Sequence, residues 1–286
     1  MAFSPSRLLA QSYRASKTPS YATGLSASWL LHPWILFAVR ALISLYAFVV
    51  LFYRIGRWES SNDPEDEGDA GRSFSFFTVL SYWGLAFYFA FAAAHTASFA
   101  VRGKAWLENW PGWLRWLHSA LYATVTVFPW VVTAVFWAVL AARVFESTYR
   151  TWSDISQHAL NSVFAFLEIL LPASEPHPWI QLIPVIVVLA CYLGLAYITH
   201  AVQGWYVYSF LDIEENGSGL VAGACIGILV ASIVVFVAVR YLIWLRKWVT
   251  EKKLGFGPTP GRALRHAHAA EEMKDFRTAD SPVTRK

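Results

Sequence analysis

Six long apolar runs divide this chain, and they constrain its fold more than any other feature. A bilayer core of about 30 Å needs roughly 20 apolar residues in each helix that crosses it. The runs cover residues 29–53, 74–100, 118–143, 157–172, 179–201 and 219–245, the fourth being short and ending at Pro172. We therefore predict an all-α integral membrane bundle of about six transmembrane helices.

The composition supports a membrane location. Of 286 residues, 56% are apolar and only 15% are charged, against roughly 25% charged in soluble domains. Tryptophan, tyrosine and phenylalanine number 15, 13 and 20, which suits residues at membrane interfaces. No basic helix alternates with aromatic residues, so we expect no nucleic-acid partner. Cys191 and Cys225 both lie in apolar runs, which argues against a disulfide framework or zinc site, and we expect no cofactor.

Three parts follow from this pattern. Residues 1–28 form a tail, 29–245 a six-helix transmembrane domain, and 246–286 a basic tail that we predict to be disordered. Residues 58–71 form an acidic loop expected to be flexible. Residues 103–117 carry four tryptophans at helical spacing and are interpreted as an interfacial segment on the membrane surface. In the last run, Gly219, Gly223 and Gly227 predict close packing against another helix.

Orientation follows from lysine and arginine near the helix ends. With six spans, the side that holds both termini carries 16 basic residues, and the other side carries 5. We therefore place both termini in the cytosol. The expected location is the endoplasmic reticulum or the plasma membrane, with surrounding membrane lipids as partners. The oligomeric state remains open.

Polar side chains in the fourth run are costly in a membrane and are candidates for function. Asp154, His158, Asn161 and Glu168 follow one another at steps of four, three and seven residues, which puts them on one face of a regular helix. Such a face must point into the bundle or into a water-filled cavity. A structural polar stripe is the alternative.

Arg40 and Glu168 both fall near the middle of the bilayer, because they enter from opposite sides of the bundle. An Arg40–Glu168 ion pair would neutralise two buried charges. Alternatively, Arg40 would receive the carboxylate of a fatty acid. We favour the structural pair.

Three segments bring a hydroxyl and two imidazoles to one leaflet. Thr78 and Tyr82 lie on one face at the lumenal start of the second run, His158 lies at a similar depth in the fourth, and His200 ends the fifth. A threonine hydroxyl becomes a nucleophile when a nearby base takes its proton, and histidine is the usual base. A threonine in a membrane helix more often bonds a backbone carbonyl.

At these residues the chain resembles the androgen-induced protein family, which includes the androgen-dependent TFPI-regulating protein. The resemblance spans about residues 30–240. Three stretches carry it: the segment around Phe77 and Thr78, the segment from His158 to Glu168, and residues 197–211 (YITHAVQGWYVYSFL), which form the strongest match. The sequence departs from the family pattern at Asp154, Ile155 and Ala159.

The resemblance implies an intramembrane lipid ester hydrolase that acts on fatty acid esters of hydroxy fatty acids or similar long-chain acyl esters. Thr78 would be its nucleophile and His158 its base. Asp154, one turn earlier, would orient the imidazole. The oxyanion donor is not determined, and Asn161, Tyr82 and His200 are the candidates.

Two other interpretations compete with the hydrolase. A non-enzymatic transporter or lipid-binding scaffold would use the buried Arg, Glu and His groups, although no internal repeat supports a transporter. A metal site formed by His158 and His200 is weak, because no third ligand is evident.

Overall fold

The structure is a computed structural model that describes residues 14, 18–60, 70–141, 145 and 147–258. Within these residues the chain forms helices and no strand, which confirms the predicted all-α class. The long helices are α3 (Pro33–Ser60), α5 (Phe77–Arg102), α6 (Gly112–Val135), α9 (Leu182–Gln203) and α10 (Ile213–Lys247). Shorter helical elements are α2 (Pro19–Ser26), α4 (Ala70–Ser73), η1 (Trp106–Asn109), α7 (Thr148–Ile155), η4 (Ser156–Leu160), α8 (Asn161–Leu170), η5 (Trp179–Gln181) and η6 (Ser209–Leu211); the turns η2 (Phe136–Leu140) and η7 (Trp248–Lys253) extend α6 and α10.

Five helical segments of the described chain are long and apolar enough to cross a membrane: Pro33–Arg57, Phe77–Arg102, Gly112–Leu140, Trp179–Gln203 and Ile213–Lys253. They match five of the six predicted runs. The sixth crossing segment is built from α7, η4 and α8, of 8, 5 and 10 residues. This segment therefore begins well before residue 157, where the prediction placed its start, because its first part is too polar to appear as an apolar run.

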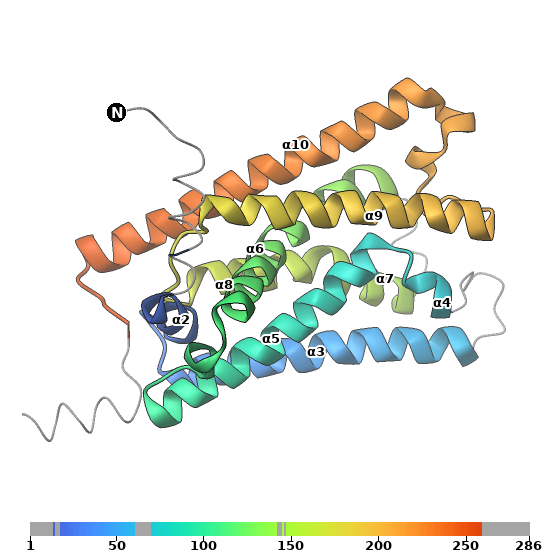
Figure 1. The fold of residues 1–286 in the computed structure, drawn as a ribbon. Helices are drawn as coiled ribbons and strands as arrows, with labels where there is room; N and C mark the ends of the chain where they lie inside the picture. Colours follow the sequence, from blue (N-terminus) through green and yellow to red (C-terminus); the bar gives the residue numbers. More distant parts are fainter. Residues whose placement is uncertain (1–13, 15–17, 61–69, 142–144, 146, 259–286) are drawn as a thin grey trace, which may run out of the picture.

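Helix α6 is the centre of the bundle and packs against α5, α8, α9 and α10. Helices α3 and α5 pair along one side, and α9 and α10 lie together on the opposite side (Figure 1). Helices α9 and α10 bury much less of their surface than α5 and α6 do. They form a loosely packed outer layer, and this looseness creates the cavity described below.

Loops gather at the two ends of the bundle in the way that six crossings require. At one end, the residue 27 carbonyl accepts from the Ala173 amide at 2.9 Å, the Thr23 hydroxyl donates to Glu108 at 3.0 Å, and the rings of Trp29 and Phe256 stack. At the other end, Trp205 contacts both Phe76 and Arg72. The segments before α3, after α5, after α8 and after α10 therefore meet at one end.

Two details differ from the sequence predictions, and one agrees with them. Part of the predicted N-terminal tail is helix α2, which packs against α5 and η1. Gly217 has φ 77° and separates the first turn of α10 from its spanning part, which agrees with a predicted start near residue 219. The glycine stripe of α10 was wrongly predicted to pack closely, because no atom lies within 4 Å of a Cβ built on Gly219, Gly223 or Gly227.

The predicted flexible loop and disordered tail are largely outside the described residues, which omit 61–69 and 259–286.

Candidate functional site

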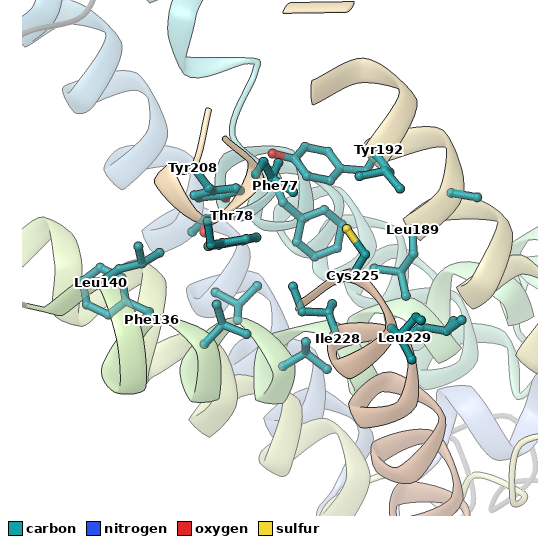
Figure 2. Close-up of a pocket in the computed structure, with 18 of the residues that line it drawn as sticks. Phe77, Thr78, Phe136, Leu140, Leu189, Tyr192, Tyr208, Cys225, Ile228 and Leu229 are labelled. Carbon is teal, nitrogen blue, oxygen red and sulfur yellow. The ribbon is translucent and has the colours of Figure 1, made fainter. Parts of the chain in front are cut away.

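Thr78 lies in the first turn of α5, at the wall of a cavity of about 290 Å³. Helix α5 begins here because Phe76 has an extended backbone, with φ −87° and ψ 130°. The cavity lies between α6, α9 and α10, and Figure 2 shows Thr78 facing it together with aliphatic and aromatic side chains. Its lining residues are Phe77, Thr78, Val131, Val132, Val135, Phe136, Leu140, Ile186, Leu189, Ala190, Tyr192, Leu193, Tyr208, Phe210, Leu211, Cys225, Ile226, Ile228 and Leu229. Such a lining suits a hydrocarbon chain with a few polar groups to fix its position.

The Tyr208 phenol is the polar group that meets Thr78. Its hydroxyl lies near the side chains of Thr78 and Tyr192, and its ring packs edge-on against Phe76 with 6.0 Å between ring centroids. Burial raises the pKa of Tyr208, and the nearby side chains of Thr78 and Tyr192 only partly oppose this rise. The phenol therefore stays protonated at neutral pH and can donate a hydrogen bond. Figure 2 shows Tyr208 next to Thr78 among the residues that line the cavity.

His158 is held in the π-turn η4, between α7 and α8. Its Nδ1 lies 3.0 Å from the backbone oxygen of Asp154 and 3.8 Å from the Asp154 carboxylate. Since a carbonyl oxygen only accepts, the proton belongs on Nδ1, and Nε2 is then the basic nitrogen. Asp154 thus lies where it can orient the imidazole, and it does so mainly through its backbone carbonyl, which is closer to Nδ1 than its carboxylate is.

One aromatic ring connects His158 with the cavity. Phe136 lines the cavity and stacks on the imidazole, with ring centroids 3.5 Å apart and planes inclined by 7°. The Trp137 indole also donates to the His158 carbonyl at 2.9 Å. Among the described residues, no hydrogen bond joins Thr78 directly to His158. Thr78 therefore lines the cavity, whereas His158 lies against the Phe136 ring and does not line it, so the two are not a preformed dyad.

Arg54 is a site residue that sequence reasoning missed. It donates from Nη1 to the Gln157 amide oxygen at 2.9 Å, and it interacts electrostatically with Asp154, His158 and Tyr208. Its cation thus lies beside the π-turn. In the sequence, Arg54 follows an apolar run and counts only toward orientation, whereas Tyr208 is one residue of the matched stretch 197–211.

The three predicted oxyanion donors lie elsewhere. The Asn161 side-chain oxygen accepts from Thr133 at 3.1 Å and from the Ser162 amide at 2.7 Å, so it ties α8 to α6. The Tyr82 hydroxyl is buried without a hydrogen-bond partner among the described residues, in the hydrophobic core. The His200 ring stacks on Tyr206 with 3.7 Å between centroids.

His158, Asn161 and Glu168 of the fourth span are buried in the bundle, as predicted, but they do not all face the same helix. Glu168 faces Arg40, whereas Asn161 faces Thr133 and His158 faces Phe136. A π-turn adds a residue to one helical turn and therefore rotates everything that follows. The regular steps of four, three and seven do not survive that rotation.

Arg40 and Glu168 form a buried ion pair with 1% and 2% of their side chains exposed. The guanidinium donates to Glu168 through Nε at 3.1 Å and Nη2 at 2.5 Å, and also to the Thr96 hydroxyl at 2.5 Å and the Leu25 carbonyl at 2.9 Å. The Tyr88 hydroxyl completes the cluster by donating to Glu168 at 2.7 Å. Arg40 thus joins α2, α3, α5 and α8, and its guanidinium already donates its hydrogen bonds to groups of the protein.

Within the described residues, no three His, Cys, Asp or Glu side chains form a group that could hold a metal ion. His158 and His200, the weak metal pair of the sequence analysis, stack on different aromatic rings.

The described chain is thus a polytopic helical membrane protein with a hydroxyl group at the wall of an apolar cavity. It belongs to the FAR-17a/AIG1-like protein family, whose family model matches residues 36–246. This is the androgen-induced protein family that the sequence motifs indicated. No curated protein and no solved structure matches the chain.

Proposed function

We propose that the protein is an intramembrane lipid ester hydrolase in which Thr78 is the nucleophile and His158 the general base. The observation that supports this most is the Thr78 hydroxyl, which lies beside the Tyr208 phenol in a wall of otherwise apolar side chains. A reactive hydroxyl next to space for a hydrocarbon chain suits an ester whose acyl chain comes from the membrane. Membership of the FAR-17a/AIG1-like family is compatible with this activity.

In this reaction the Thr78 oxygen attacks the ester carbonyl carbon, and its proton passes to Nε2 of His158. The bond between the carbonyl carbon and the alcohol oxygen then breaks, and the alcohol leaves with the proton from His158. Water hydrolyses the acyl-threonine in a second round, which releases the fatty acid and restores the hydroxyl. Because no direct bond joins the two residues in the free structure, substrate binding must move Phe136 or admit a water between them.

Tyr208 takes the role that the sequence analysis left open among Asn161, Tyr82 and His200. A carbonyl carbon attacked by Thr78 places its oxygen within a bond length or two of the threonine oxygen, in the region that the Tyr208 hydroxyl borders. A donor fixed at the point where negative charge develops stabilises the transition state. Arg54 adds positive potential to the same region.

The decisive experiment measures hydrolysis of long-chain fatty acid esters by the purified protein in detergent. Thr78→Ala and His158→Ala should abolish turnover, and Tyr208→Phe should lower kcat by about 10²-fold with little change in KM. Tyr206→Phe is the matched control, because Tyr206 lies in the same loop but packs on His200. Full activity in Thr78→Ala would show that another residue is the nucleophile.

A fluorophosphonate probe tests the same assignment without a known substrate. The probe should label the wild type, and labelling should disappear in Thr78→Ala while Tyr206→Phe keeps it. If hydrolysis and labelling are both absent from the wild type, a non-catalytic lipid-binding protein becomes the better interpretation.

A further inference from the structure

A second cavity, of about 390 Å³, lies on the other flank of α9. It is formed by α5, α6 and α9, whereas the Thr78 cavity lies between α6, α9 and α10. Two residues, Phe77 and Tyr192, line both cavities. Helix α9 thus has one cavity on each side of it, and Phe77 and Tyr192 separate the two cavities.

Phe77 is the centre of this partition. Its ring lies 5.0 Å from the ring of Phe128 and 4.9 Å from that of Tyr192, measured between centroids. Phe77 also precedes Thr78 directly, so the partition and the proposed nucleophile belong to the same helical turn. Any molecule that reacts at Thr78 therefore meets Phe77 first on its way to the second cavity.

The chemistry of the second cavity favours hydrocarbon. Its three hydroxyl-bearing residues donate those groups to backbone carbonyls: Ser81 to Thr78 at 3.0 Å, Thr124 to Leu121 at 2.8 Å and Tyr192 to Ser75 at 3.0 Å. Val187 and Val188 line it and are 50% and 40% exposed at the surface of the bundle. In a membrane that surface faces lipid, so an alkyl chain can enter sideways from the bilayer.

We propose that this second cavity binds the hydrocarbon chain on the alcohol side of the ester, while the Thr78 cavity binds the acyl chain. The proposal rests on the proposed function. It follows from the position of Thr78. An ester whose carbonyl lies there has an acyl chain and an alcohol chain, and one apolar cavity lies on each side of Phe77 to hold each chain. Phe77 and Gly84 then determine which esters bind. Phe77 separates the acyl chain from the alcohol chain, and Gly84 leaves room for the alcohol chain.

Gly84 offers a clean way to fill the second cavity. It lines that cavity, and a Cβ built on it meets no atom within 4 Å. Gly84→Leu should therefore occupy the space without a clash. Gly194→Leu is the matched control, because Gly194 has equally open surroundings on α9 but lines neither cavity.

The test compares methyl palmitate with hexadecyl palmitate, which share an acyl chain and differ only on the alcohol side. Gly84→Leu should lower kcat/KM for the hexadecyl ester relative to the methyl ester by about tenfold or more, since several methylene contacts are lost. Gly194→Leu should leave this ratio as in the wild type. An unchanged ratio in Gly84→Leu, or an equal loss for both esters, overturns the proposal.

A binding measurement separates failure of the proposal from failure of the proposed function. A photoreactive diazirine analogue of hexadecanol should crosslink to the wild type next to Val188, and Gly84→Leu should lose that crosslink while Gly194→Leu keeps it. Crosslinking without ester hydrolysis would retain the second site and reject the hydrolase. Hydrolysis with no crosslink near Val188 would retain the hydrolase and reject the site.

Discussion

At the scale of single residues, the buried Arg40–Glu168 pair shows how far sequence reasoning reaches in a membrane. A charged residue inside an apolar run needs a partner, so the two charges could be matched by depth alone. The other members of the cluster, Tyr88, Thr96 and the Leu25 carbonyl, could not be predicted, because a tyrosine or threonine in a membrane helix is not unusual.

We expect the pair to be essential for stability and not for chemistry. Arg40→Met or Glu168→Leu leaves one buried charge uncompensated, which costs about 3–5 kcal/mol in a buried ion pair. The double variant Arg40→Met/Glu168→Leu should lose less than the sum of the single losses, because it removes both charges. Thermal unfolding in detergent measures this, with Leu42→Ala on the exposed face of α3 as the control. Additive losses would mean that the two side chains are not coupled.

Individual elements show where sequence patterns fail. Five of the six predicted apolar runs match long helices, because hydropathy alone places them in lipid. The fourth span was misjudged twice, since Arg150 and Asp154 conceal its first turns and the π-turn at Ser156–Leu160 has no sequence signal. That turn brings His158 to Phe136, so the candidate base depends on a feature that periodicity cannot predict. Tyr208 was missed for a related reason, because a loop brings it to Thr78.

The segment of residues 171–178 behaves as a structural element although it has no regular helix. Arg240 donates to the His177 carbonyl, Arg246 donates to the Ser174 carbonyl, and the Ser174 and Tyr122 hydroxyls are 2.9 Å apart. His177 is fully buried, and its Nε2 lies 2.8 Å from the Thr126 hydroxyl. The segment thus fastens α6 to α10 at the end of the bundle where α2 also lies.

His177 should make stability depend on pH. Burial, together with the nearby Arg240 cation, lowers the pKa of His177 from 6.5 to about 3. Above pH 6.5 the imidazole is neutral whether the chain is folded or unfolded, so its contribution to stability is complete. Between pH 6.5 and about 3 the unfolded chain binds the proton and the folded one does not, so stability falls as pH falls, by at most about 1.4 kcal/mol per unit.

The substitution His177→Gln isolates this effect, because glutamine retains a hydrogen-bonding group for Thr126 but does not titrate. Unfolding midpoints measured from pH 7.5 to pH 5 should fall less steeply for His177→Gln than for the wild type. Parallel slopes would show that His177 is not responsible for the acid sensitivity.

At the scale of the whole molecule, the site depends on the loops, which lie alternately at the two ends of the bundle along the chain. Thr78, His158 and the Tyr208 loop come together only if the polar α7–η4–α8 segment also crosses the bundle. The structure supplies this crossing although hydropathy identifies only five apolar segments in the described chain. Sequence could predict the alternation from span counts, but it could not predict that α6 would be central or that α9 would pack loosely enough to leave cavities.

The last prediction tests this alternation in a membrane. Lys104 and Glu214 are both exposed, the first in the loop after α5 and the second in the first turn of α10, at opposite ends of the bundle. In a background with Cys191 and Cys225 replaced by alanine, Lys104→Cys should react with a membrane-impermeant maleimide in sealed microsomes, whose outer face is cytosolic. Glu214→Cys should react only after detergent permeabilisation. Reaction of both cysteines before permeabilisation would contradict six crossings, and with them the shared leaflet of Thr78 and His158.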